Sequence, residues 1–286
     1  VSVSKLGSGW ISVEFESVLD SVDVVDVQAK AERSPLLTSA DPAAFEVQQV
    51  EFSEDSNGEL SSELMAQVAN VAVSGADAGS EEAGGGAGVA VAIVDTGVTE
   101  HPAIADSLLP GFDFVSGGEA NKGQRADQEV SYDGDYVDEA TYGPLGWDSN
   151  PSDPGDWNQS RNSTWHGTFM AGVVASANAD YPGVAPAASI VPVRAISWAG
   201  GTVADISAAI NWSAGALVEG AAINENPADI INFSFSIRAE CSPMLQDAIN
   251  TANELGSLVV VAAGNAGGNV AAYAPANCDG VLSVAA

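Results

Sequence analysis

The chain has 286 residues, of which 46% are hydrophobic, so it is long enough to bury the core of one large domain. Lys and Arg together number 8 and Asp and Glu number 39, which gives a formal net charge of -31. This charge repels phosphate backbones and anionic lipid surfaces, so it excludes nucleic-acid binding and membrane-surface binding as functions. The acids are spread along the sequence, which favours a solvated shell over a cation store.

The ends of the chain and its cysteines leave several questions open. No apolar stretch approaches the roughly 18 to 20 residues that span a bilayer. The chain starts at Val1 without a methionine or a charged and then apolar leader, so we expect it to be a piece of a longer protein whose signal peptide is absent. Cys241 and Cys278 are compatible with a disulfide or with two buried thiols, and their spacing alone does not decide.

The first 56 residues differ in pattern from the rest of the chain. Apolar and polar residues alternate at Trp10 to Glu16 and at Phe45 to Phe52, which predicts two half-buried strands. We therefore expect a small α+β segment over residues 1–56. Residues 57–88 hold a helical pattern, Leu64 to Val73, and then a glycine-rich acidic run, which predicts a lead-in helix and a linker.

From residue 89 onward, short apolar runs rich in β-branched residues alternate with helix-like stretches. The apolar runs lie at 89–94, 189–196, 229–235, 257–263 and 281–286. The helix-like stretches lie at 166–178, 204–215 and 242–255. This alternation is typical of a parallel sheet covered on both faces, so we predict a doubly wound, mostly parallel α/β domain over 89–286. Residues 113–162 are polar and rich in glycine and proline, and we predict one long surface excursion there.

Functional groups of such sheets gather at the carboxyl ends of the strands, and three polar residues are therefore candidates for a functional site. Asp95 follows the apolar run V-A-I-V, although alone it suits a turn or a cap as well. His166 opens a helix, and the only other histidine is His101; a single histidine is more often a packed or surface residue than a catalyst. Asn265 follows V-V-V-A-A-G, where alone it suits a left-handed turn.

Four short motifs, three of which contain these residues, indicate a function when they are taken together. They are D-T-G at 95–97, H-G-T at 166–168, N-F-S-F-S at 232–236 and A-A-G-N at 262–265. In this order they resemble the subtilisin-like serine proteases, from about residue 60 to the end of the chain. The segment D-S-N-P-S-D-P-G-D-W at 148–157 and the paired cysteines are similar to the secreted bacterial branch of that family. The resemblance implies a subtilisin-like fold and a secreted serine endopeptidase.

The resemblance implies a role for each candidate. Asp95 would accept the imidazole N–H of His166, and His166 would act as general base and then general acid. Asn265 would donate its amide to the oxyanion of the tetrahedral intermediate. The nucleophilic serine would lie in a G-T-S motif, which these 286 residues do not contain. We therefore expect the serine outside this sequence, and the chain alone to be almost inactive, because loss of the nucleophile costs roughly 10⁶ in turnover.

The resemblance also implies a way to bind polypeptide substrates. An extended peptide would add as a strand between two segments, Gly200, Gly201 and Thr202 on one side and Ser234, Phe235 and Ser236 on the other. Two positions depart from the family pattern. Phe169 stands where a second histidine is usual, and Phe235-Ser236 replaces a common Leu-Gly, so we expect an altered primary specificity pocket.

Three further expectations concern partners and ligands. The resemblance implies a Cys241–Cys278 disulfide. Residues 1–56 resemble the tail of a protease propeptide, with an ordinary appended module as the alternative. The chemistry needs no cofactor, and the acidic stretch at 133–139 is either a structural Ca²⁺ loop or a solvated loop. We expect a monomer that binds polypeptides but neither nucleic acid nor membranes; a non-catalytic, subtilase-like peptide-binding module is the alternative function.

Overall fold

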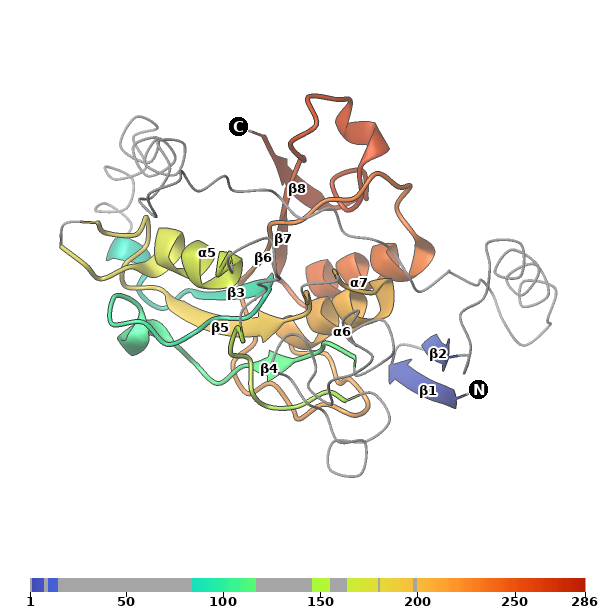
Figure 1. The fold of residues 1–286 in the computed structure, drawn as a ribbon, viewed down its shortest axis with the longest axis horizontal. Coiled ribbons are helices and arrows are strands. Elements are labelled where there is room, and N and C mark those ends of the chain that lie inside the picture. The colour runs from blue at the N-terminus through green and yellow to red at the C-terminus, as the bar shows by residue number, and fades with distance from the viewer. Residues whose placement is uncertain are drawn as a thin grey trace, which may run out of the picture.

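Figure 1 shows the fold in a computed structural model, which describes residues 2–7, 10–14, 84–116, 146–154, 164–179, 181–197 and 200–285. Six strands form one sheet in the order β4-β5-β3-β6-β7-β8, and every pairing in it is parallel. The strands are β3 (Ala90–Asp95), β4 (Phe112–Asp113), β5 (Ser189–Arg194), β6 (Ile230–Phe233), β7 (Leu258–Ala262) and β8 (Val281–Val284). The helices are α5 (His166–Ala175), α6 (Val203–Ser213) and α7 (Pro243–Glu254). The predicted α/β fold is confirmed.

Alternation along the buried strands divides the core into two layers. On β3, Val91 and Ile93 pack in one cluster with residues of α5. Ala92 and Val94 point to the opposite face and pack in the larger cluster, which contains residues of α6 and α7. Because successive side chains of a strand point to opposite faces, α5 covers one face of the sheet, and α6 and α7 lie side by side on the other (Figure 1).

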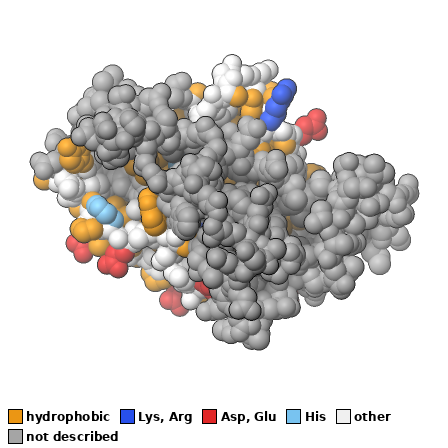
Figure 2. All heavy atoms as spheres, viewed as in Figure 1, with side chains coloured by type: hydrophobic (Ala, Val, Ile, Leu, Met, Phe, Trp, Pro, Cys, Tyr) orange, Lys and Arg blue, Asp and Glu red, His pale blue; other side chains and the backbone are white. Residues whose placement is uncertain are grey.

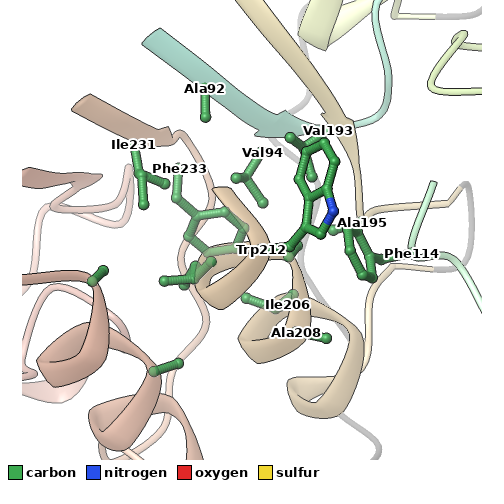
Figure 3. Packing of buried hydrophobic residues seen from close by; sticks show 14 of the residues in the cluster. Ala92, Val94, Phe114, Val193, Ala195, Ile206, Ala208, Trp212, Ile231 and Phe233 are labelled. Carbon is green, nitrogen blue, oxygen red and sulfur yellow. The ribbon is translucent and has the colours of Figure 1, made fainter. Parts of the chain in front are cut away.

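Aromatic side chains fill the larger layer near β5. Trp212 of α6 lies among Val94, Val193 and Phe114 (Figure 3). The ring centroids of Phe114 and Trp212 are 5.9 Å apart, and those of Phe114 and Trp147 are 4.9 Å apart. These rings bring the segments around residues 114 and 147 into the core.

The sequence prediction for residues 113–162 is therefore wrong at its start and around residue 147. Asp113 belongs to strand β4 at the edge of the sheet, and Trp147 is a core residue with 3% exposure. The physical reason is aromatic burial, since the local abundance of polar residues hid two rings, Phe114 and Trp147, that each remove a large apolar area from water. Residues 117–145 and 155–163 are outside the described part of the chain.

Two of the three described helices begin at a residue whose side chain caps them. Thr202 and Ser242 cap α6 and α7, accepting hydrogen bonds from the N–H groups of Asp205 and Leu245. Helix α5 begins differently: its N-cap residue, Trp165, has a left-handed backbone with φ 50° and makes no side-chain capping bond. An aromatic residue with positive φ is rare and costs on the order of 1 kcal/mol or more, so it marks a constrained position beside His166.

Outside this domain, β1 (Ser2–Gly7) pairs antiparallel with β2 (Trp10–Glu14). A strand is therefore present where Trp10 to Glu16 predicted one. The predicted elements at Phe45 to Phe52 and Leu64 to Val73 lie outside the described residues. No described helix combines the length and the apolar character needed to cross a bilayer.

Candidate active site

Asp95 and His166 meet at the carboxyl edge of the sheet. Asp95 is the last residue of β3 and His166 is the first residue of α5. The Nδ1 atom of His166 lies 2.8 Å from Oδ1 and 2.9 Å from Oδ2 of Asp95. Asp95 is fully buried, and His166 is 6% exposed. The pair is thus removed from water, where a charge-assisted hydrogen bond is strongest.

The chemistry of the two groups fixes the histidine tautomer. A carboxylate only accepts hydrogen bonds, so the Nδ1 atom of His166 carries the proton that Asp95 receives. Thr96 donates its backbone N–H to Oδ1 of Asp95 at 2.7 Å, which holds the carboxylate in place. In the neutral imidazole the remaining nitrogen, Nε2, then carries a lone pair and can accept a proton from a nucleophile.

The close approach of strand and helix depends on glycine. A Cβ atom on Gly167 would collide with the carbonyl oxygen of Gly97 and lie 3.0 Å from the Cβ of Asp95. Gly97 itself has φ +105°, a backbone conformation that favours glycine. The glycines of D-T-G and H-G-T therefore allow the two motifs to touch.

The predicted substrate segment at 234–236 reaches His166 through one side chain. The ring of Phe235 lies with its centroid 4.9 Å from that of His166. Ser234 accepts a hydrogen bond from Asn232 at 2.8 Å, and its hydroxyl points at the sulfur of Met170 on α5 at 3.3 Å. Phe235 thus forms one wall beside the histidine.

The other predicted substrate segment lies at the start of α6. Gly200 exchanges two backbone hydrogen bonds with Ser197, at 2.8 and 2.9 Å, and Thr202 caps the helix. A small apolar cavity of ≈ 30 Å³ lies between the start of α6 and the segment after β6. Its lining residues are Val203, Ile206, Phe233, Phe235, Ser236, Ile237, Leu245, Ala274 and Pro275. Phe235 and Ser236 of one predicted segment therefore line this hollow, whereas the other segment, Gly200 to Thr202, only precedes the lining residue Val203 in the sequence.

Asn265 is less closely tied to the pair. It is exposed in the loop that follows β7. The preceding Gly264 lies against Ser236, because a Cβ on this glycine would be 2.8 Å from the Ser236 hydroxyl oxygen. Asp95 and His166 therefore contact each other directly. Asn265 is linked to them only indirectly, because Gly264 contacts Ser236, and the neighbouring Phe235 packs against His166.

Sequence reasoning missed residues that surround the pair. Thr96 was part of the D-T-G motif without an assigned role, and Asp153 was part of a family-like segment without one. Asp153 is 5% exposed, and its carboxylate accepts a hydrogen bond from the Thr96 hydroxyl at 2.7 Å. A buried acid in a polar, proline-rich stretch gives no sequence signal that separates it from exposed acids.

Three more ionisable side chains are buried nearby. Arg194, the register neighbour of Asp95 on β5, forms an ion pair with Asp113 of β4 at 2.6 Å. Asp205, in the first turn of α6, accepts hydrogen bonds from the Ser116 hydroxyl at 2.5 Å and the Trp147 indole at 3.1 Å. Burial raises the pKa of Asp205 from 3.8 to about 6, and these hydrogen bonds only partly offset that rise.

Metal binding has no support among the described residues, which contain no group of three His, Cys, Asp or Glu side chains that could hold an ion. The candidate Ca²⁺ loop at 133–139 lies outside them. On the face shown in Figure 2, the acidic side chains are scattered along the rim and do not gather into one patch in the part of the chain that is coloured.

Cys241 and Cys278 form a disulfide, with their Cα atoms 5.2 Å apart. It connects the segment before α7 to the segment before β8. The pairing agrees with what the resemblance implied.

A buried aspartate–histidine pair at the carboxyl edge of a doubly wound sheet is the arrangement of the subtilisin-like proteases, the class that the motifs resemble. Residues 86–286 match the subtilase family, and the chain belongs to that family. It is 39% identical over 213 residues to an extracellular protease of Xanthomonas campestris pv. campestris, and 36% identical over 205 residues to an extracellular basic protease of Dichelobacter nodosus.

Each of these alignments covers 70% of this chain and 33% of the relative, so the chain spans about a third of the length of these two relatives. Among solved structures, a protease from Pseudoalteromonas arctica matches with a TM-score of 0.58 and 39% identity. That match covers 69% of this chain and 56% of the other. The family match over residues 86–286 contains the Asp95–His166 pair.

Proposed function

We propose that the complete protein is a serine endopeptidase that hydrolyses peptide bonds with an Asp–His–Ser triad. The observation that carries this proposal is the buried hydrogen bond between Asp95 and His166, at 2.8 Å. In the proposed reaction, Nε2 of His166 takes the proton of a serine hydroxyl and later returns it to the leaving amine. Asp95 keeps the imidazole in the required tautomer and stabilises the imidazolium that forms.

The other members of the site are proposed from their positions. The serine belongs to sequence beyond these 286 residues, which contain no G-T-S motif. Asn265 would donate its amide to the oxyanion, a contribution of roughly 10² to 10³ in rate for such a donor. An extended peptide would pair with Gly200, Gly201 and Thr202 and with Ser234, Phe235 and Ser236.

The location of the enzyme is proposed from the names of its relatives and from its disulfide. Two relatives are named extracellular proteases, and a disulfide persists in oxidising compartments, so we infer a secreted, monomeric enzyme. Residues 1–56 would be its propeptide segment. A structural Ca²⁺ ion at 133–139 remains a proposal from sequence alone.

The test uses the protein with its whole encoded sequence. The wild type should hydrolyse casein and should be labelled by a fluorophosphonate, which reacts with activated serines, and peptide mapping should place the label outside the 286 residues. His166→Ala should lower turnover by roughly 10⁶ and abolish labelling, because the serine loses its base. His101→Ala, at the only other histidine, is the matched control and should behave as the wild type.

A wild-type protein that is folded, binds peptides and shows neither labelling nor hydrolysis would instead establish the non-catalytic binding module. Labelling that persists in His166→Ala would remove the proposed role of the histidine.

A further inference from the structure

A buried acid, Asp153, lies one hydrogen bond away from the residues that follow Asp95 and His166. Its Oδ2 atom accepts a hydrogen bond from the Thr96 hydroxyl at 2.7 Å, and the side chain is removed from water. The same hydroxyl oxygen accepts the backbone N–H of Gly167 at 3.0 Å. Thr96 therefore connects Asp153 to the first turn of the helix that carries His166.

The carboxylate of Asp153 sets the direction of the Thr96 hydroxyl. A hydroxyl has one proton to donate and two lone pairs that accept. An ionised carboxylate only accepts, so the Thr96 proton must point to Asp153 and a lone pair is left facing Gly167. Without that acceptor, the hydroxyl would be able to rotate and present its proton to the Gly167 N–H, which would break the second bond.

Helix α5 needs this bond because it has no local cap. The first N–H groups of a helix lack partners inside the helix, and a side chain at the N-cap position normally satisfies one of them. The N-cap residue of α5 is Trp165, which makes no such bond. Thr96, from the turn after β3, supplies the missing oxygen, and the negative charge of Asp153 lies near the positive end of the helix dipole.

The segment that carries Asp153 is fixed against the D-T-G turn. Val98 donates its N–H to the carbonyl of Pro151 at 2.9 Å, and the Thr99 hydroxyl donates to the carbonyl of Asp153 at 2.9 Å. A Cβ on Gly97 would lie 2.7 Å from the Asp153 nitrogen, so the two backbones are in direct contact. Asp153 is therefore held at a defined position behind the pair.

From these contacts we propose that Asp153 is a positioning residue for His166, acting through Thr96. Its carboxylate orients the Thr96 hydroxyl, which caps α5 and so sets the first residue of that helix against Asp95. This inference rests on the proposed protease function, because its effect is measured as catalysis. A displacement of about 1 Å in such a group costs on the order of 10²-fold in rate.

The experiment is a double-mutant cycle in the complete protein, with active sites counted by fluorophosphonate titration so that misfolded molecules do not contribute. Asp153→Ala, which removes the acceptor of the Thr96 hydroxyl, and Thr96→Val should each lower kcat by about 10- to 100-fold with KM nearly unchanged, because the substrate segments lie elsewhere. The double variant should lose no more than Thr96→Val alone. Thr96→Ser, which keeps the hydroxyl, should restore most of the activity.

Asp148→Ala is the matched control, since it truncates another aspartate of the same segment 146–154 and should leave kcat unchanged. Losses that add in the double variant, or wild-type kcat in Thr96→Val, would overturn the inference. If Asp153→Ala does not fold, Asp153→Leu, which fills a similar space without an acceptor, takes its place with the same expected loss. An inactive wild type would instead contradict the proposed function, and the two failures are thus distinct.

Discussion

The two halves of the described domain are stabilised by different means. The buried ionisable side chains all precede residue 206, namely Asp95, Asp113, Asp153, His166, Arg194 and Asp205. Residues 206–285, which the structure describes without a gap, bury apolar and uncharged polar side chains and carry the Cys241–Cys278 disulfide. The half that holds the Asp–His pair thus adds buried, hydrogen-bonded ionisable groups to an apolar core that both halves share, and the half that holds Asn265 adds a covalent link.

This difference separates interactions that fix the positions of side chains from interactions that only stabilise the fold. Buried charges require partners at defined distances, so they fix side chains in one arrangement even when they add little net stability. A disulfide and an apolar core stabilise the fold without demanding one orientation at each atom. Asp95 and His166 belong to the half in which buried charges fix the side chains, while Asn265 is exposed on a loop that contains Gly264, Gly267 and Gly268.

The largest expected effect comes from breaking the ion pair between Arg194 and Asp113. Arg194→Met should cost about 3–5 kcal/mol of unfolding free energy, because it leaves the Asp113 carboxylate, which is 2% exposed, without its countercharge. The double variant Arg194→Met with Asp113→Asn should lose clearly less, since no uncompensated charge stays buried. Chemical denaturation of the wild type and the two variants measures both values, and a double variant that loses as much as Arg194→Met, or more, would contradict the pairing argument.

A smaller loss of stability, on the other half, should follow removal of the disulfide. Replacing Cys241 and Cys278 by serine should cost about 2–4 kcal/mol, because the link closes a segment with a sequence separation of 37 residues. Turnover measured well below the unfolding temperature should stay near the wild-type value, since the contacts described for Asp95 and His166 involve neither cysteine. A fall in kcat without a fall in the thermal midpoint would contradict the prediction, because the disulfide would then act on catalysis and not on stability.

How far the sequence predicted the structure differs between the regular elements and the charged groups around the pair. The apolar runs and helix patterns predicted β3, β5 to β8, α5, α6 and α7 within a few residues, because continuous β-branched runs and capped helices are local signals. The motifs D-T-G and H-G-T predicted that Asp95 and His166 would meet, through resemblance and not through periodicity.

The charged network around the pair was not predictable in the same way. The edge strand Phe112–Asp113 has only two residues, too few for a periodic pattern. Asp153 and Arg194 are defined by contacts across 57 and 81 positions of sequence. Burial of a charge follows from which segments meet in space, and a single sequence shows no such contact.

The smallest expected effect is a pH dependence of stability that arises from Asp205. Its pKa in the folded protein is about 6, above the ordinary 3.8, because burial disfavours the charged form. The folded state therefore holds the proton more tightly than the unfolded state, so this group's contribution is fully present below pH 3.8 and is lost as the pH rises through about 6. Between pH 5 and pH 7 the loss should be on the order of 1 kcal/mol.

Asp205→Asn isolates this contribution, because the amide does not titrate and its oxygen can still accept from Ser116 and Trp147. The free energy of unfolding of the wild type, minus that of Asp205→Asn, should fall from pH 5 to pH 7, while the other acids cancel in the difference. Two parallel curves would mean that Asp205 is already charged at pH 5 in the folded protein. The hydrogen bonds from Ser116 and Trp147 would then outweigh its burial, and the charged half would gain stability from this acid instead of losing it.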